Sequence, residues 1–102
     1  MISLIEQRRA ELEETCRKFH VKTLEAFGSI VDGRFDSTRS DLDFLVEFLP
    51  EAASRTFSGY FDLKHELEEI FRRRVDLVMP GAIRNPYFKK SVNRQRKVLY
   101  AA

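Results

Sequence analysis

Hydrophobic residues recur at helical spacing in two stretches of the chain. In residues 3–18, Leu4, Ile5, Leu12 and Cys16 stand among glutamates and arginines. In residues 54–74, apolar and aromatic residues return every three or four positions, with lysines and glutamates between them. Such periodicity is typical of a helix that buries one face. The pattern therefore predicts two amphipathic helices.

Three other stretches have the composition and alternation of β-strands. They are residues 21–27, 41–48 and 75–79, and they are followed by Gly28, Leu49-Pro50 and Pro80. After them the pattern favours a short helix over residues 86–93 and an extended segment at 98–100. The order helix, strand, strand, helix, strand predicts an α/β (α+β) domain, in which helices pack on a small mixed sheet.

The length of the chain bounds this architecture. A chain of 102 residues has room for one core, so we expect a single domain spanning residues 1–102. Its apolar runs reach only five residues, far short of the roughly 20 that span a bilayer, and the first residues do not resemble a signal peptide. We therefore expect a cytoplasmic protein. Cys16, the one cysteine, has only His20 and His65 as companions, too few for a zinc site of these ligands.

Charge is distributed unevenly along the chain. The formal net charge is +2, but residues 1–80 sum to −4, and residues 81–102 contain six lysines and arginines and no acid. A basic segment suits nucleic acid, a nucleoside triphosphate or an acidic protein surface, and it is also common on ordinary solvated surfaces. Charge alone leaves these partners open.

Two aspartates stand in a predicted strand, although aspartate is disfavoured there. Because side chains alternate along a strand, Asp41 and Asp43 project from one face, roughly 6.6 Å apart, and Leu42 and Phe44 from the other. Two carboxylates on one rigid face repel each other unless a cation neutralises them, and Mg²⁺ prefers such oxygen ligands. A solvated strand edge would explain the same pattern, so this pair alone leaves both interpretations open.

A third aspartate and a Gly-Ser pair add to this pattern. Asp76, inside an apolar strand, could complete a triad that holds two metal ions about 3.5–4 Å apart, could accept a proton, or could simply face water. Gly28 would let a ligand approach the backbone closely, and Ser29 could bind phosphate oxygens with its hydroxyl and amide groups. Capping a helix is the alternative role for Ser29.

Taken together, these segments resemble the signature of a known superfamily. The residues that carry the resemblance are Gly28 and Ser29, Ser40-Asp41-Leu42-Asp43, and Val75-Asp76-Leu77-Val78. Their combination is similar to that of the DNA polymerase beta-like nucleotidyltransferases, and the length and layout look like the minimal members, the MNT proteins. These are commonly paired with HEPN proteins in toxin–antitoxin modules. The resemblance covers nearly the whole chain and implies the nucleotidyltransferase fold.

The resemblance also implies a role for each matching residue. Asp41 and Asp43 would bind Mg²⁺, with two ions expected, and Asp76 would be the third catalytic and metal-binding carboxylate. Gly28, Ser29 and Ser40 would bind the nucleotide. The implied reaction is transfer of AMP from ATP to an acceptor hydroxyl, with release of pyrophosphate. In MNT antitoxins of this kind the acceptor is a tyrosine of the cognate HEPN toxin, which is an RNase.

Two features depart from the family pattern. Eleven residues separate the Gly-Ser pair from the first aspartate of the strand, one more than is usual. In addition, Asp32 precedes Gly33 where many relatives have an arginine. Arg34 or Arg39 could supply the missing contact with the triphosphate, and the sequence does not choose between them.

Two other functions are compatible with the sequence. One is a catalytically weak antitoxin that masks its partner directly. The other is nucleotide transfer to RNA, which the basic C-terminal segment favours and the lack of room for an RNA-binding domain disfavours. A homodimer or a complex with the HEPN toxin would suit a domain with so small an interior. The sequence identifies neither the acceptor, nor the preferred nucleotide, nor the number of nucleotides transferred.

Overall fold

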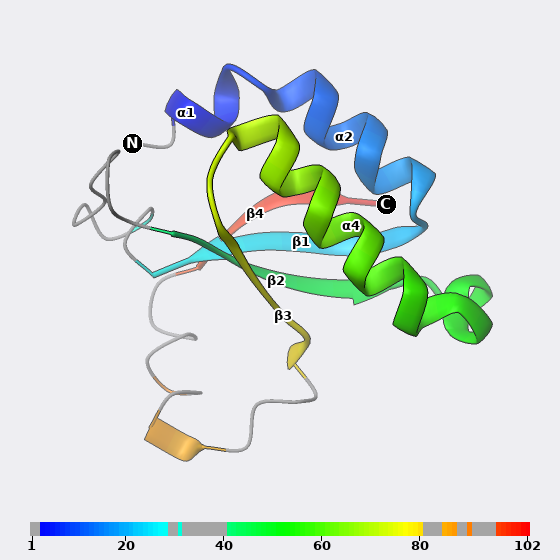
Figure 1. Ribbon diagram of the computed structural model, residues 1–102. Coiled ribbons are helices and arrows are strands. Elements are labelled where there is room, and N and C mark those ends of the chain that lie inside the picture. Colours follow the sequence, from blue (N-terminus) through cyan, green and yellow to red (C-terminus); the bar gives the residue numbers. More distant parts are fainter. Residues whose placement is uncertain (1–2, 29–30, 32–40, 81–84, 88–89, 91–95) are drawn as a thin grey trace.

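The computed structural model describes residues 3–28, 31, 41–80, 85–87, 90 and 96–102. Its helices are α1 (Ser3–Glu6), α2 (Arg9–Lys18), the 3-10 helix η1 (Pro50–Arg55) and α4 (Thr56–Phe71). Its strands are β1 (Val21–Phe27), β2 (Leu42–Phe48), β3 (Val75–Val78) and β4 (Arg96–Ala101). The helices lie together over one face of the sheet (Figure 1). Within the described part of the chain, no helix has the length and apolarity that crossing a membrane requires.

The sheet mixes parallel and antiparallel pairs, as predicted. Its strand order is β3-β2-β1-β4. β1 is antiparallel to both β2 and β4, whereas β2 and β3 run parallel. The two central strands are therefore joined through the segment that begins at Gly28, and the parallel strand β3 is reached by a crossover through α4. β4 extends the short predicted segment at 98–100 in both directions and forms the edge beside β1.

The core lies between the helices and the face of the sheet that they cover. On α4 the fully or nearly fully buried residues are Leu63, Leu67 and Phe71, one helical turn apart. They face alternate residues of the strands, and the ring of Phe71 lies 6.1 Å from that of Phe44 in β2. The buried strand residues of this cluster include Leu24, Ala26, Leu42, Phe44, Val46, Val75 and Leu77. The other face of the sheet carries a second, smaller buried cluster of Phe27 and Leu45, with Val78 packed against it, and the site described below.

The N-terminal helix differs from the single helix predicted over residues 3–18. The chain turns at residues 7–8, where the amide of Arg8 donates to the carbonyl of Ile5 at 3.0 Å, and α2 begins at Arg9. No residue from position 6 to 11 is buried. Core packing therefore does not hold this part in one continuous helix, although Ile5 and Leu12 on either side of it are fully buried.

The helix predicted over residues 54–74 ends at Phe71, three residues earlier than predicted, because the chain must turn into β3. Arg72 has a positive φ of 53°, and the carbonyl of Arg74 already accepts a bond from the amide of Leu42 in β2 at 3.0 Å. Side chains of α4 then bind β3 directly. Glu68 accepts from the amide of Val75 at 3.0 Å, and the hydroxyl of Tyr60 donates to the carbonyl of Leu77. The long helix thus holds the strand that carries Asp76.

The helix predicted over residues 86–93 is only partly covered by the structure. Pro86, Tyr87 and Lys90 are helical, and the remaining positions lie outside the described residues. The strand predictions for residues 21–27, 41–48 and 75–79 are confirmed to within one residue at each end.

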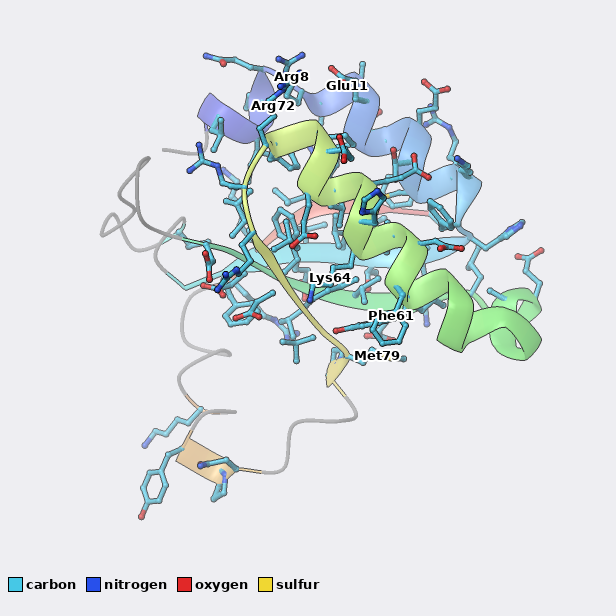
Figure 2. All side chains as sticks on the ribbon, viewed as in Figure 1. Arg8, Glu11, Phe61, Lys64, Arg72 and Met79 are labelled. Atoms are coloured by element: carbon cyan, nitrogen blue, oxygen red, sulfur yellow. The ribbon has the colours of Figure 1, made fainter. Side chains whose placement is uncertain are left out.

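Replacing Leu67 with alanine should destabilise the protein by about 2–5 kcal/mol, because the leucine is 0 % exposed between α4 and the sheet. Phe61→Ala is the matched control on the same helix. Phe61 is 53 % exposed, projects on the side of α4 turned away from α2 (Figure 2), and stacks edge to face on Tyr60. Its loss should cost at most about 1.5 kcal/mol. Urea unfolding measures both, and equal losses would contradict the assigned core.

Candidate active site

Three aspartates lie near one another at one end of the sheet, on the side turned away from the helices. Asp43 lies in β2 opposite Asp76 of β3, and Asp41 stands two residues earlier, immediately before the strand. Leu42 and Phe44, which alternate with them, are fully buried under the helices. The prediction that Asp43 lies on the face opposite to Leu42 and Phe44 is therefore confirmed. Asp41 precedes the strand, and its place on the face of Asp43 stays a prediction. Parallel strands lie about 4.8 Å apart, so the Asp43 and Asp76 side chains leave the sheet as direct neighbours.

The acids are unequally exposed, and this sets their electrostatics. Asp43 and Asp41 are half-buried, whereas Asp76 is exposed. Burial, and secondarily the charges of Asp76 and Asp41, raises the pKa of Asp43 from 3.8 to about 6. No described lysine, arginine or histidine forms an ion pair with any of the three. The charged form of Asp43 is thus disfavoured, and none of the ion pairs seen among the described residues offsets this cost.

Gly28, at the end of β1, closes the other side of Asp43. Its φ is +75°, a conformation that side chains rarely adopt. A Cβ atom at this position would lie 2.5 Å from Oδ2 of Asp43, far inside van der Waals contact. The amide of Val31 donates back to the carbonyl of Gly28 at 3.0 Å, which forms a turn at the strand end. Only glycine allows the backbone turn and the carboxylate to approach so closely.

These groups suit Mg²⁺ in the chemistry of their donors. Mg²⁺ takes one or two protein carboxylates and completes its shell with waters and substrate phosphates. A half-buried carboxylate whose charge is disfavoured by neighbouring carboxylates is stabilised by such a cation. Among the described residues, no group of three or more His, Cys, Asp or Glu side chains is arranged so that it could hold a metal ion.

Several predicted residues cannot be placed at this site. Ser29, Ser40, Arg34 and Arg39 all lie outside the described residues. Their predicted roles in binding the nucleotide stay predictions, as do the metal-binding and catalytic roles of the three aspartates.

Other reactive or hollow parts of the molecule lie away from the aspartates. Cys16 is fully buried in α2, and burial raises the pKa of its thiol to about 12, which excludes it as a nucleophile near neutral pH. A hollow of about 210 Å³, lined in part by His20, Phe48 and Asp62, lies at the opposite end of β1 and β2.

Sequence reasoning did not single out the ion pair between Glu25 of β1 and Arg96 of β4. Nε of Arg96 lies 3.4 Å from Oε2 of Glu25, on the same sheet face as Asp43. Arg96 was visible only as one of six basic residues in the C-terminal segment. No spacing rule aligns residue 96 with residue 25, because their pairing depends on how β4 meets β1.

The structure combines a mixed sheet that helices cover on one face with aspartates on adjacent strands beside a glycine turn. Residues 9–99 match the model of the nucleotidyltransferase domain family, and the chain belongs to that family. The expectation of a nucleotidyltransferase enzyme is thereby confirmed.

Individual relatives agree with this assignment. Two proteins of Methanocaldococcus jannaschii, provisionally named protein adenylyltransferases, are 39% and 41% identical to this chain over 75 residues, which is 74% of this chain and 72% and 73% of theirs. A solved structure provisionally described as a minimal nucleotidyltransferase is 28% identical, with a TM-score of 0.74, over 93% of this chain and 92% of that one.

More distant structures share the fold. A chain from the complex of a tri-AMPylated Shewanella oneidensis HEPN toxin with its MNT antitoxin is 19% identical, with a TM-score of 0.61, over 95% of this chain and 72% of that one. A toxin–antitoxin complex with AMP-PNP gives 21% identity and a TM-score of 0.65, over 92% of this chain and 73% of that one. The predicted nucleotidyltransferase fold is confirmed.

Two glycine substitutions should have opposite effects on stability. Gly28→Ala should destabilise the protein by about 1–3 kcal/mol, because it combines an unfavourable φ with the contact to Asp43. Gly59→Ala lies in α4, where the nearest described atom to a new Cβ is Cε1 of Phe48 at 4.0 Å, and should stabilise it by about 0.4–1 kcal/mol. Thermal unfolding measures both. A neutral Gly28→Ala would contradict the close packing of Gly28 on Asp43.

Asp43→Asn should make the metal-free protein more stable at pH 7. Because the pKa of Asp43 is raised on folding, the folded protein between pH 3.8 and about 6 keeps a proton that the unfolded chain has lost. The contribution of Asp43 to stability therefore falls as pH rises through this window. The difference between variant and wild type should be greatest above pH 6 and disappear toward pH 3.8.

Melting temperatures of both proteins across this pH range, in the presence of a chelator, provide the test. Mg²⁺ should then stabilise the wild type more than Asp43→Asn at pH 7, since a ligand raises stability only where it binds the folded state. A pH-independent difference between the two proteins would contradict the raised pKa.

Proposed function

We propose that this chain transfers AMP from ATP to a hydroxyl group of a protein, with release of pyrophosphate and with a requirement for Mg²⁺. The observation that carries the proposal is the placement of Asp43 between Asp76 and the Gly28 turn. Membership of the nucleotidyltransferase domain family supports the reaction class. The provisional names of the Methanocaldococcus relatives support a protein as the acceptor.

Each residue has a defined task in this reaction. Asp41 and Asp43 would hold Mg²⁺, which would neutralise phosphate charge and stabilise the reacting α-phosphate. The backbone turn at Gly28 receives the remaining phosphates, and Ser29 and Ser40 contribute to nucleotide binding. Asp76 completes the carboxylate set, and its exposure supports a role in accepting the proton of the attacking hydroxyl.

The bond changes follow from that arrangement. The acceptor oxygen forms a bond to the α-phosphorus, and the bond from this phosphorus to the oxygen that bridges to the β-phosphate breaks. The electron pair of the broken bond leaves with pyrophosphate, and the hydroxyl proton passes to Asp76. Most of the barrier is lowered by holding the reacting oxygens in line and by stabilising the developing charge.

The acceptor we propose is a tyrosine of a cognate HEPN toxin, which makes this chain an antitoxin. Structures of MNT antitoxins with HEPN toxins, one of them tri-AMPylated, share its fold. The three aspartates are all present in this chain, which favours modification of the toxin over simple masking.

Asp43→Asn and Asp76→Asn should each reduce the rate of AMP transfer by at least about 100-fold, because each removes charge from the reacting centre. Purified protein is incubated with Mg²⁺, α-labelled ATP and lysate of its source cells, and the label is followed on gels. Asp62→Asn is the matched control, since Asp62 is an exposed aspartate on α4 with no place in the site.

The position of the label decides among the alternatives. Label on a small protein in the wild-type and Asp62→Asn samples, absent in the other two, supports the proposal. Label on RNA would contradict protein as the acceptor. Full neutralisation of the toxin by Asp43→Asn, without any label, would show that the chain acts by masking.

A further inference from the structure

Four residues form one row across the sheet face turned away from the helices, and one of the two inner residues, Phe27, is only 6 % exposed. The register pairs Asp76 of β3 with Asp43 of β2, Asp43 with Phe27 of β1, and Phe27 with Arg96 of β4. Residues paired in register project from the same face of a sheet. The row is therefore acidic at β2 and β3 and basic at β4, with Asp43 and Arg96 two strand spacings apart, about 10 Å.

The cation of this row is held by a neighbour on β1. Oε2 of Glu25 lies 3.4 Å from Nε of Arg96, and Glu25 is the less exposed partner, with 17% of its side chain accessible against 40% for Arg96. Glu25 pairs with Val98, whereas Arg96 pairs with Phe27. Glu25 and Arg96 are therefore diagonal neighbours on the same face of the sheet. A carboxylate that contacts Nε limits the directions in which the guanidinium can point.

The order of the strands indicates in which direction a bound triphosphate would extend across the sheet. In the proposed reaction the α-phosphate lies over the aspartates of β2 and β3, and the other two phosphates extend toward the turn at the end of β1. β4 is the next strand in that direction, and Arg96 is its first residue. Figure 1 shows the end of β1, the start of β2 and the start of β4 at the same side of the sheet.

We propose that Arg96 binds the β- and γ-phosphates of the nucleotide and that Glu25 is the residue that positions it. This inference rests on the proposed function and adds to it a residue that recognises the leaving pyrophosphate. When the bond to the α-phosphorus breaks, the electron pair moves onto the pyrophosphate, and a guanidinium beside it stabilises that charge. Arginine suits this task because its planar fork of donors matches phosphate oxygens.

The proposal also chooses among the partners that the sequence left open. The basic C-terminal segment was compatible with nucleic acid, a nucleoside triphosphate or an acidic protein surface. Arg96, the first residue of β4, directs charge of this segment toward the triphosphate.

The test compares the affinities of Mg²⁺-ATP, Mg²⁺-pyrophosphate and AMP by titration calorimetry. Arg96→Gln should weaken ATP and pyrophosphate by about 10- to 100-fold, the usual effect of removing a charged hydrogen-bond donor, and leave AMP unchanged. Lys97→Gln is the matched control, because it removes the same charge from the next residue. Lys97 pairs with buried Ala26 and so lies on the other face of the sheet.

Glu25→Gln tests the positioning role. It should weaken ATP and pyrophosphate less than Arg96→Gln does, and it should cause no further loss when combined with Arg96→Gln. A purely structural role of the ion pair would instead lower the melting temperature and weaken AMP equally. Unchanged AMP affinity in each variant therefore also shows that the fold is intact.

The outcomes separate this inference from the proposed function. Wild-type protein that binds ATP, with Arg96→Gln and Lys97→Gln equally tight, would overturn the role of Arg96 and leave the proposed function standing. Wild-type protein that binds neither ATP nor pyrophosphate would overturn both. Selective loss of ATP and pyrophosphate in Arg96→Gln, with Lys97→Gln unaffected, is the expected result.

Discussion

The site depends on the register of β2, which pairs with strands of opposite direction on its two sides. This register places Asp43 between Phe27 and Asp76, so two carboxylates stand side by side on adjacent strands. Like charges opposite each other in a sheet are unfavourable. The register is nevertheless fixed, because a shift by one residue would bring Leu42 and Phe44 out of the core and turn the aspartates into it.

The electrostatic cost at Asp43 is itself informative. Burial and its acidic neighbours disfavour its charged form, and Gly28 packs so tightly on it that no side chain fits between them. Replacing Asp43 with an uncharged residue of similar size would therefore stabilise the folded sheet. Residues that lower stability in this way are common in active sites, where function retains them. Helix α4 offsets part of this cost by binding the edge of β3 through Glu68 and Tyr60.

The strand order separates negative from positive side chains on the face turned away from the helices, and this separation suits the proposed nucleotide transfer. Acidic groups on β2 and β3 stand at one end of a row whose other end carries Arg96, held by Glu25. A substrate with a chain of phosphates has matching requirements, because its reacting phosphorus needs a cation shared with carboxylates and its leaving group needs positive charge. The helix-covered face packs in the core and supports the strands that carry these groups.

The sequence by itself determined the first three strands, the core of the long helix, the face on which Asp43 lies, and the family. These follow from local periodicity and from short motifs, which do not depend on distant contacts. Only the tertiary structure decided the break at residues 7–8, where no buried residue enforces the helix, and the positive φ of Arg72, where the chain turns into β3. The tertiary structure alone also decided the ion pair of Glu25 with Arg96 and the packing of Gly28 on Asp43. Both contacts arise from pairing between strands far apart in the chain, and no periodicity within a strand specifies its partner.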